Sequence, residues 1–125
     1  MRANELRIGN FVDERVVGYC VVNDISNSYL IVTGIYRKDL MYSVLPENAH
    51  PIPLTEEWLL KFGFKAVPFA IPDKFDNRKI QIKRDERGFW VIACYNFILI
   101  KHVHQLQNLY FALTGEELTI KKTEL

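Results

Sequence analysis

The sequence predicts an α+β fold, mainly an antiparallel sheet with two short helices, and three observations point to this class. Short segments rich in apolar residues, several of them alternating with polar ones, indicate strands. Two segments, 55–62 and 103–113, instead place apolar residues three or four positions apart, as amphipathic helices do. Glycine, proline, aspartate and asparagine stand between the segments, so short turns and antiparallel pairing are favoured.

The N-terminal part of the chain predicts a meander of strands. The first strand alternates up to a bend at Gly9 and Asn10, and turn-forming residues at 24–28 separate two further apolar segments. This order resembles the first strands of small SH3-like barrels. Three prolines then exclude a continuous ladder or helix at 46–53. The expected strands are residues 6–13, 16–23 and 29–33, with a shorter one at 41–45.

The first helix, 55–62, has the clearest local signal in the chain. Thr55 is expected to cap it, because its hydroxyl can accept from a free amide of the first turn, and two glutamates follow at the positive end of the helix dipole. Gly63 is suited to end the helix in the left-handed conformation, with Phe64 folding back onto Leu59. A helix of two turns persists only when packed, so we interpret this motif as structural.

The second half of the chain centres on a three-stranded meander between residues 79 and 101. Asp85 and Gly88 are the first and last residues of a turn between its first two strands, as a type I turn prefers. Residues 97–100 form a continuous apolar run, which predicts a central strand covered on both faces. Residues 118–120 are expected to form a final strand after the second helix.

The second helix, 103–113, is expected to bury one apolar stripe and to end at Gly115. His104, Gln107 and Asn108 are expected on the opposite, polar side. Such a side can hydrogen-bond a partner or another part of the same chain. The stripe itself comprises Val103, Leu106, Leu109, Tyr110 and Leu113.

Composition and charge favour one cytoplasmic domain over residues 1–125. The chain has 125 residues, of which 49% are hydrophobic, which suits a single core. Its net charge of +1 gives a weaker field than a dedicated nucleic-acid binder usually has, although residues 1–57 carry −3 and residues 58–125 carry +4. The charged N-terminus lacks a signal sequence and the longest apolar stretch, 91–100, is too short to span a bilayer, so no membrane association is expected.

No group of reactive residues predicts catalysis. Cys20 and Cys94 lie in apolar, strand-like runs, and we interpret both as buried thiols rather than as a disulfide or a nucleophile. A metal site combining His50, His102 and His104 is conceivable, but their spacing matches no established ligand pattern. The sequence therefore predicts no metal and no cofactor, and it favours a protein that is not an enzyme.

A hairpin with basic and aromatic residues at 78–90 is the first candidate binding surface. Its cationic side chains can contact phosphates and its aromatic rings can stack on bases. Two acidic residues dilute the charge, so a solvated hairpin without a ligand is the alternative interpretation. The candidate binding residues are Arg78, Lys83, Arg84, Arg87 and Trp90 in the hairpin, with His104, Gln107 and Asn108 on the second helix.

Three stretches of the chain, residues 5–10, 51–64 and 103–118, carry a resemblance to a known group of proteins. They resemble a family of short uncharacterised proteins of gut bacteria, often associated with prophages and other mobile elements. The resemblance spans most of the chain and is weakest in the middle. It implies a bacterial cytoplasmic setting and favours a partner linked to phage or plasmid biology, but it implies no activity.

The leading hypothesis is therefore a small non-catalytic interaction module of a bacterial mobile element, with a protein as its partner. The first alternative is a nucleic-acid-binding accessory protein that uses the hairpin 78–90. The second alternative is a small enzyme or metal-binding protein that uses His50, His102 and His104.

Overall fold

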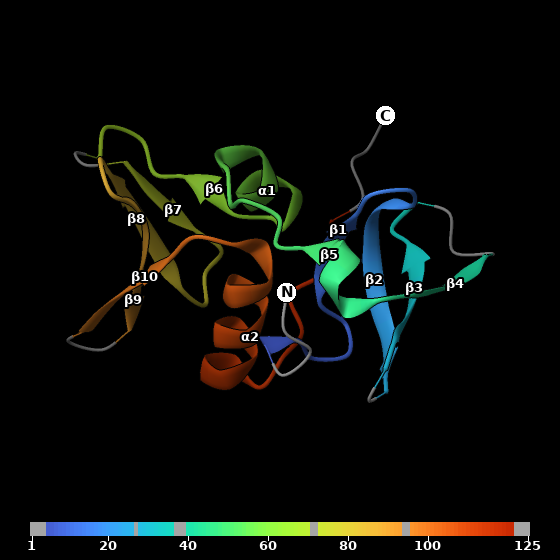
Figure 1. Cartoon of the computed structure of the whole chain (residues 1–125). Helices are drawn as coiled ribbons and strands as arrows, with labels where there is room; N and C mark the ends of the chain where they lie inside the picture. The colour runs from blue at the N-terminus through green and yellow to red at the C-terminus, as the bar shows by residue number, and fades with distance from the viewer. Residues whose placement is uncertain (1–4, 27, 37–39, 71–72, 94–95, 122–125) are drawn as a thin grey trace. The chain divides into compact units, whose positions relative to one another are not determined.

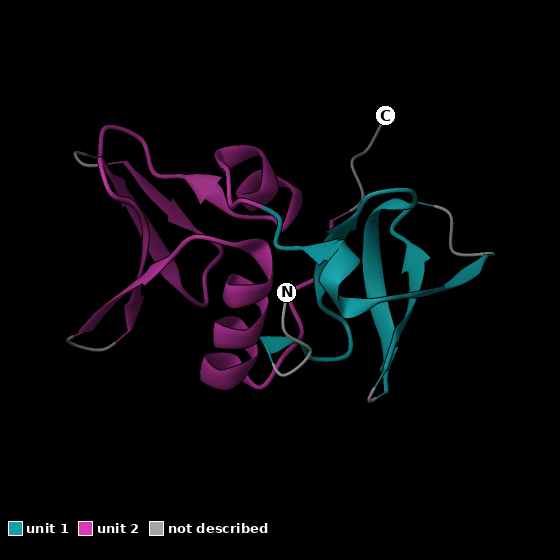
Figure 2. Ribbon diagram, in the orientation of Figure 1, with its two compact units in different colours: residues 1–52 teal, residues 53–125 magenta. Residues whose placement is uncertain are grey.

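The computed structural model describes residues 5–26, 28–36, 40–70, 73–93 and 96–121. The chain forms two compact units, residues 1–52 and 53–125 (Figure 2). Each unit contains one five-stranded antiparallel sheet, and two α-helices belong to the second unit. The α+β class with a mainly antiparallel sheet is thus confirmed. The expectation of a single domain over residues 1–125 stays a prediction.

The first unit is a meander whose last short strand returns to pair with the first. Its sheet has the order β4-β3-β2-β1-β5, and a 3-10 turn at Pro46–Asn48 lies between β4 and β5. The expected meander is confirmed, although the first strand starts later than expected. The strands are β1 Phe11–Glu14, β2 Gly18–Ile25, β3 Leu30–Gly34, β4 Met41–Val44 and β5 Ala49–His50.

Strand β5 was not expected, because the prolines of residues 46–53 argued against a ladder. It has only two residues, which pair with Asp13 and Glu14 of β1. The prolines flank this pair of residues and do not interrupt it, so no ladder hydrogen bond is lost to a missing N–H. Inward-facing side chains of the sheet and Leu6, which precedes β1, then form a buried cluster of Leu6, Val12, Cys20, Val22, Leu30, Val32 and Ala49.

The second unit packs both helices on the same side of its sheet (Figure 1). The sheet has the order β10-β9-β8-β7-β6, which includes the expected three-stranded meander. Side chains on the helix-covered face are buried, among them Phe75, Ile82 and Val91. The strands are β6 Lys65–Ala66, β7 Lys74–Asp76, β8 Gln81–Asp85, β9 Gly88–Ala93 and β10 Asn96–Ile100, and the helices are α1 Glu56–Lys61 and α2 Val103–Thr114.

Helix α1 has the caps that the sequence predicts. The Thr55 hydroxyl accepts from the Trp58 amide at 3.3 Å. Gly63 takes a φ of +89°, where a side chain would be strained. The amide of Phe64 donates to the carbonyl of Leu59, and the amide of Gly63 donates to that of Leu60, each at 3.0 Å. These two bonds form a Schellman motif, and Phe64 is buried as expected.

Helix α2 forms where expected, but its buried stripe is rotated. Val103, Leu106 and Tyr110 are buried as expected, whereas Leu113 is 45% exposed. Gln107 lies one turn after Val103 and about 40° from it around the helix, so it shares the buried stripe. The helix ends at Gly115, which takes a φ of +74°. Among the described residues, neither helix has the length and hydropathy needed to cross a membrane.

Two expectations about strands in the second unit are wrong. Strand β10, expected at the centre of the sheet, is an edge strand, and its first three residues are exposed. Residues 118–120 form no strand. The chain instead runs back to α1, where the Lys121 amide donates to the Lys61 carbonyl at 2.8 Å. Because this segment does not join the sheet, one side of β10 has no neighbouring strand among the residues that the structure describes.

Candidate functional site

The candidate site is the face of the second sheet that the helices do not cover. Residues directly opposite one another in neighbouring strands point to the same face. Lys83 pairs with Lys74 and with Trp90, and Trp90 pairs in turn with Leu99. A parallel row runs through Lys65, Asp76, Gln81, Ile92 and Phe97. We call the side chains of these two rows the outer face: Lys65, Lys74, Asp76, Gln81, Lys83, Trp90, Ile92, Phe97 and Leu99.

Apolar and aromatic groups dominate the β9–β10 part of the outer face. Phe97 is 53% exposed, and Trp90, Ile92 and Leu99 are half-buried. The ammonium nitrogen of Lys83 lies 4.3 Å from the centroid of the Phe97 ring, a cation–π contact that spans the neighbouring strand. The result is an open platform on which rings, aliphatic groups and a lysine stem lie together.

Charges of both signs lie on and beside the outer face. Lys65, Lys74 and Lys83 are offset in part by Asp76 and by Asp85, which ends β8. The Asp85 carboxylate accepts from the Trp90 indole N–H and from the Arg87 amide, each at 2.9 Å. The Trp90 indole, and after it the Arg87 amide, holds the pKa of Asp85 below its ordinary value. Asp85 is therefore an anion at neutral pH and the platform has no strong single-sign field.

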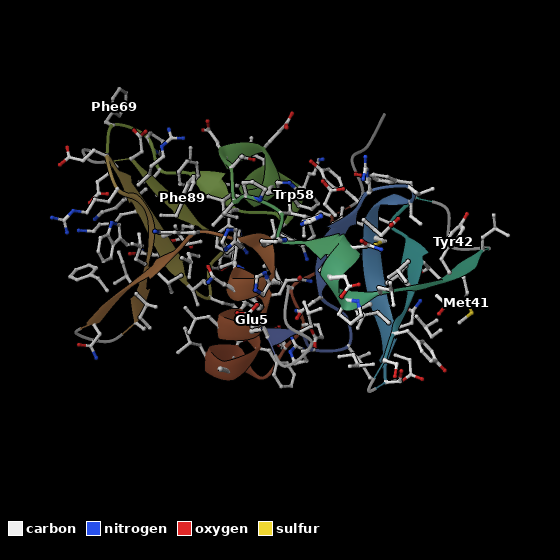
Figure 3. All side chains as sticks on the ribbon, viewed as in Figure 1. Glu5, Met41, Tyr42, Trp58, Phe69 and Phe89 are labelled. Carbon is white, nitrogen blue, oxygen red and sulfur yellow. The ribbon has the colours of Figure 1, made fainter. Side chains whose placement is uncertain are left out.

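Arg84, expected among the binding residues, lies on the opposite, helix-covered face. Its guanidinium donates to Asp73 at 2.7 Å and lies 3.7 Å from Glu56 of α1. It also stacks over two rings, 5.6 Å from the centroid of Phe75 and 5.8 Å from that of Phe89. Figure 3 shows Phe89 between the sheet and the helices. The hydrogen bond to Asp73 raises the pKa of Arg84. The contacts of this side chain join sheet and helix within the unit.

The other basic residues of the hairpin do not gather with Lys83. Arg78 lies in the turn between β7 and β8 with a φ of +77°, and its amide donates to the Asp76 carboxylate. Arg87 lies in the turn at the far end of β8. The structure therefore brings Lys83 and Trp90 together on the outer face, places Arg84 on the opposite face, and leaves Arg78 and Arg87 in turns. An open depression beside Arg78 is lined by Asp76, Lys79, Ile80, Gln81 and Ile92.

The polar side of helix α2 is not the exposed surface that the sequence indicated. His104 is 6% exposed and Gln107 is 1% exposed, so both are buried, while Asn108 is half-buried. The expectation of an exposed polar face is wrong because Gln107 shares the stripe of Val103 and Tyr110. The polar groups of His104 and Gln107 are therefore inside the protein, where polar groups are normally hydrogen-bonded within the chain.

The three histidines of the alternative metal hypothesis belong to two different units. His102 precedes α2, and its ring stacks on that of His104 with centroids 5.8 Å apart. His50 belongs to the first unit. Within the described ranges, no three His, Cys, Asp or Glu side chains are grouped so that they could hold a metal ion.

Cys20 is buried, as the sequence predicts. Its thiol donates weakly to the Val12 carbonyl, with a sulfur–oxygen distance of 3.6 Å. Burial, and after it the charges of Glu14 and Asp13, raises the pKa of Cys20 to about 12. The thiol is protonated at neutral pH and is a poor nucleophile. Cys94 lies outside the described residues.

Sequence reasoning missed the apolar members of the outer face. Phe97 and Leu99 were assigned to a covered strand because their run is continuously apolar. They face outward because Phe97 pairs with Ile92 and Leu99 pairs with Trp90. This register is seen only in the folded sheet. Phe69 was also missed: it is fully exposed, has a φ of +61°, and projects from the loop before β7 (Figure 3).

The outer face can bind through contact area and hydrogen bonds. Its titratable groups are three lysines and one aspartate with a second aspartate at the hairpin turn, an arrangement that suits recognition. Comparisons of the chain with protein-family models, with curated proteins and with solved structures find no match.

Proposed function

We propose that this protein is a small non-catalytic interaction module that binds another protein through the outer face of its second sheet. The resemblance of residues 5–10, 51–64 and 103–118 to proteins of gut bacteria and their mobile elements supports a cytoplasmic role in such an element. The partner would then be a protein of the host cell or of the element itself.

The observation that carries this proposal is the exposed apolar platform beside charges of both signs. Cores of protein interfaces are enriched in aromatic residues and depleted of unpaired charge. Trp90 and Phe97 provide large rings, and Trp90 is positioned by the hydrogen bond of its indole to Asp85. Side chains of this kind act as anchors in binding, and contiguous apolar exposure on a sheet is a typical mark of a contact surface.

One observation favours a nucleic acid as the alternative ligand. Lys83, Trp90 and Phe97 share one open antiparallel face, and single-stranded nucleic acids stack their bases on rings of this kind beside cationic groups. Asp76 and Asp85 oppose this, because they lie on or beside the same face and repel phosphates. Binding of a nucleic acid would weaken steeply with salt, whereas an apolar protein interface would not.

Affinity capture from the native host with a matched pair of variants tests the proposal. Phe97→Ser removes an exposed ring from the outer face, and Leu113→Ser removes an exposed apolar side chain of similar accessibility from α2. Each lysate is divided, and one half is treated with nucleases. We expect a discrete protein to be captured by the wild type and by Leu113→Ser, but not by Phe97→Ser, with no effect of the nucleases.

Two outcomes would contradict the proposal. Equal capture by Phe97→Ser and the wild type would remove the outer face as the binding surface. Loss of all capture after nuclease treatment, together with a steep salt dependence, would support the nucleic-acid alternative instead. Circular dichroism of both variants confirms that they are folded before capture is compared.

A further inference from the structure

Two residues of strand β10 have backbone N–H and C=O groups that point away from the sheet. The Arg84 amide donates to the Asp73 carbonyl at 2.8 Å, so even-numbered residues of β8 bond to β7. Hydrogen-bonded pairs alternate along antiparallel strands, so odd-numbered residues of β8 bond to β9. The registers then direct Ile98 and its even-numbered neighbours of β10 toward β9. The N–H and C=O groups of Phe97 and Leu99 therefore point outward.

The chain itself shows that this edge can pair. Lys101 is the next outward-pointing residue after Leu99, and its carbonyl accepts from the Leu54 amide at 2.9 Å. Pro53 and His102 form an antiparallel bridge at the same place. A segment of the same unit thus occupies the edge just beyond β10. Among the described residues, no segment occupies the edge at Phe97 and Leu99.

The open part of the edge lacks the features that normally prevent pairing. Edge strands are usually protected by lysines, prolines or bulges, and residues 96–100 contain none of these. Phe97 is 53% exposed and Ile98 is 38% exposed. The segment contains no charged residue. It therefore selects a partner strand by shape and backbone bonds, without requiring opposite charge.

We propose that β10 pairs antiparallel with β10 of a second copy of this chain, forming a two-fold symmetric dimer. With the axis at Ile98, Phe97 of one copy stands opposite Leu99 of the other, and the reverse pair is equivalent. This register joins every outward N–H and C=O of these two residues. The two sheets become one continuous sheet, in which no like charges meet along β10.

Self-pairing goes beyond the proposed function because it joins backbone groups at the edge of the sheet, although the side chains of the pairing residues Phe97 and Leu99 belong to the outer face. A second copy suits this edge because two outward residues, spaced two apart, are complementary to themselves under a two-fold axis. A dimer would place two outer faces side by side in one extended surface. Capture of a partner and dimerisation are measured separately, so either can fail without the other.

A proline substitution tests the backbone bonds directly. Proline lacks an N–H, and at Leu99 the lost donor is one that points away from β9. The matched control is Leu99→Ala, which trims the side chain but keeps the N–H. By sedimentation velocity we expect the wild type and Leu99→Ala to dimerise, and we expect the dimer dissociation constant of Leu99→Pro to rise at least about tenfold. Circular dichroism checks that Leu99→Pro stays folded.

A charge-swap experiment tests the position of the axis without using proline. Only an axis at Ile98 places residue 98 of one copy directly opposite residue 98 of the other. Ile98→Lys and Ile98→Glu should each be monomeric alone, because like charges then stand opposite each other, and their equimolar mixture should form a heterodimer. Ile98 is 38% exposed, so a charged end at this position can reach solvent.

Three results would overturn the proposal. The first is a wild-type chain that stays monomeric up to about 100 μM, because any self-association would then be too weak to be useful. In that case, capture of an extended segment of another protein at this edge would be the better account. The second is a dimer that Leu99→Pro leaves unchanged, which would place the interface elsewhere. The third is a mixture of the two Ile98 variants that remains monomeric.

Discussion

Lys83 and Arg84 are neighbours on β8 and carry the same charge, but the structure gives them opposite surroundings. Arg84 lies on the helix-covered face, where it meets two carboxylates and two aromatic rings. Lys83 lies on the outer face, where it reaches over the ring of Phe97. Successive side chains of a strand point to opposite faces, so adjacent basic residues of a hairpin do not form one binding surface. Residue type alone therefore does not tell which face of the sheet a basic side chain such as Arg84 occupies.

The aromatic neighbours Phe89 and Trp90 on β9 repeat this contrast. Phe89 is buried against Phe75, with ring centroids 6.3 Å apart. Trp90 is half-buried on the outer face and donates its indole N–H to Asp85. One face of the sheet thus stabilises the fold by packing against helices. The opposite face presents rings and lysines that the fold itself does not bury.

The largest expected difference between the faces is in packing energy. Ile82 lies on the helix-covered face and is fully buried, so Ile82→Ala should lower the free energy of unfolding by about 2–5 kcal/mol. Ile92 lies on the outer face and is half-buried, so Ile92→Ala should lower it by about 1 kcal/mol. Urea denaturation of both variants measures the two values. Equal losses would mean that the outer face is part of the core.

A smaller difference is expected between the two basic neighbours. Arg84→Ala removes partly exposed ion pairs and two ring contacts, which should lower the free energy of unfolding by about 1 kcal/mol. Lys83→Ala should change it by less than about 0.5 kcal/mol, because its contact with the exposed Phe97 ring and its attraction to the exposed Asp85 carboxylate are both weakened by solvent. Urea denaturation of the Arg84→Ala and Lys83→Ala variants measures the two changes. A larger loss for Lys83→Ala would reverse the roles assigned to the two residues.

The smallest expected effect concerns the carboxylate beside the outer face. The pKa of Asp85 is lowered, so its contribution to stability is present above the ordinary value of 3.8 and is lost as the pH falls through the lower folded value. The NMR signal of the Trp90 indole N–H should move below pH 3.8 as its acceptor is protonated. In Asp85→Asn this titration should be absent. A Trp90 signal that titrates identically in both proteins would exclude the assigned hydrogen bond.

Local signals predicted a large part of the fold. Thr55 and Gly63 lie at the two ends of α1, as predicted, because capping depends on a few consecutive residues. Asp85 and Gly88 likewise close the β8–β9 hairpin. The meanders followed because short turns leave antiparallel pairing as the simplest connection. Where the determining chemistry is local, the sequence was sufficient.

The parts that failed depend on distant pairing. The run at residues 97–100 is apolar enough for a central strand, and only the path of the chain after α2 leaves β10 at the edge. Gln107 is polar, but its angular position on α2 places it among buried neighbours. The candidate site was found in part, through Lys83 and Trp90. Its other half, Phe97 and Leu99, required the register between β9 and β10.

The two tryptophans of the chain offer the most direct test of the difference between the faces. Trp58 on α1 is 4% exposed, whereas Trp90 is half-buried on the outer face. In Trp58→Phe the only remaining tryptophan is Trp90, and in Trp90→Phe it is Trp58. We expect acrylamide to quench the fluorescence of Trp90 strongly and that of Trp58 weakly. Equal protection of both indoles would show that the outer face is covered, and the proposed binding surface would then not exist.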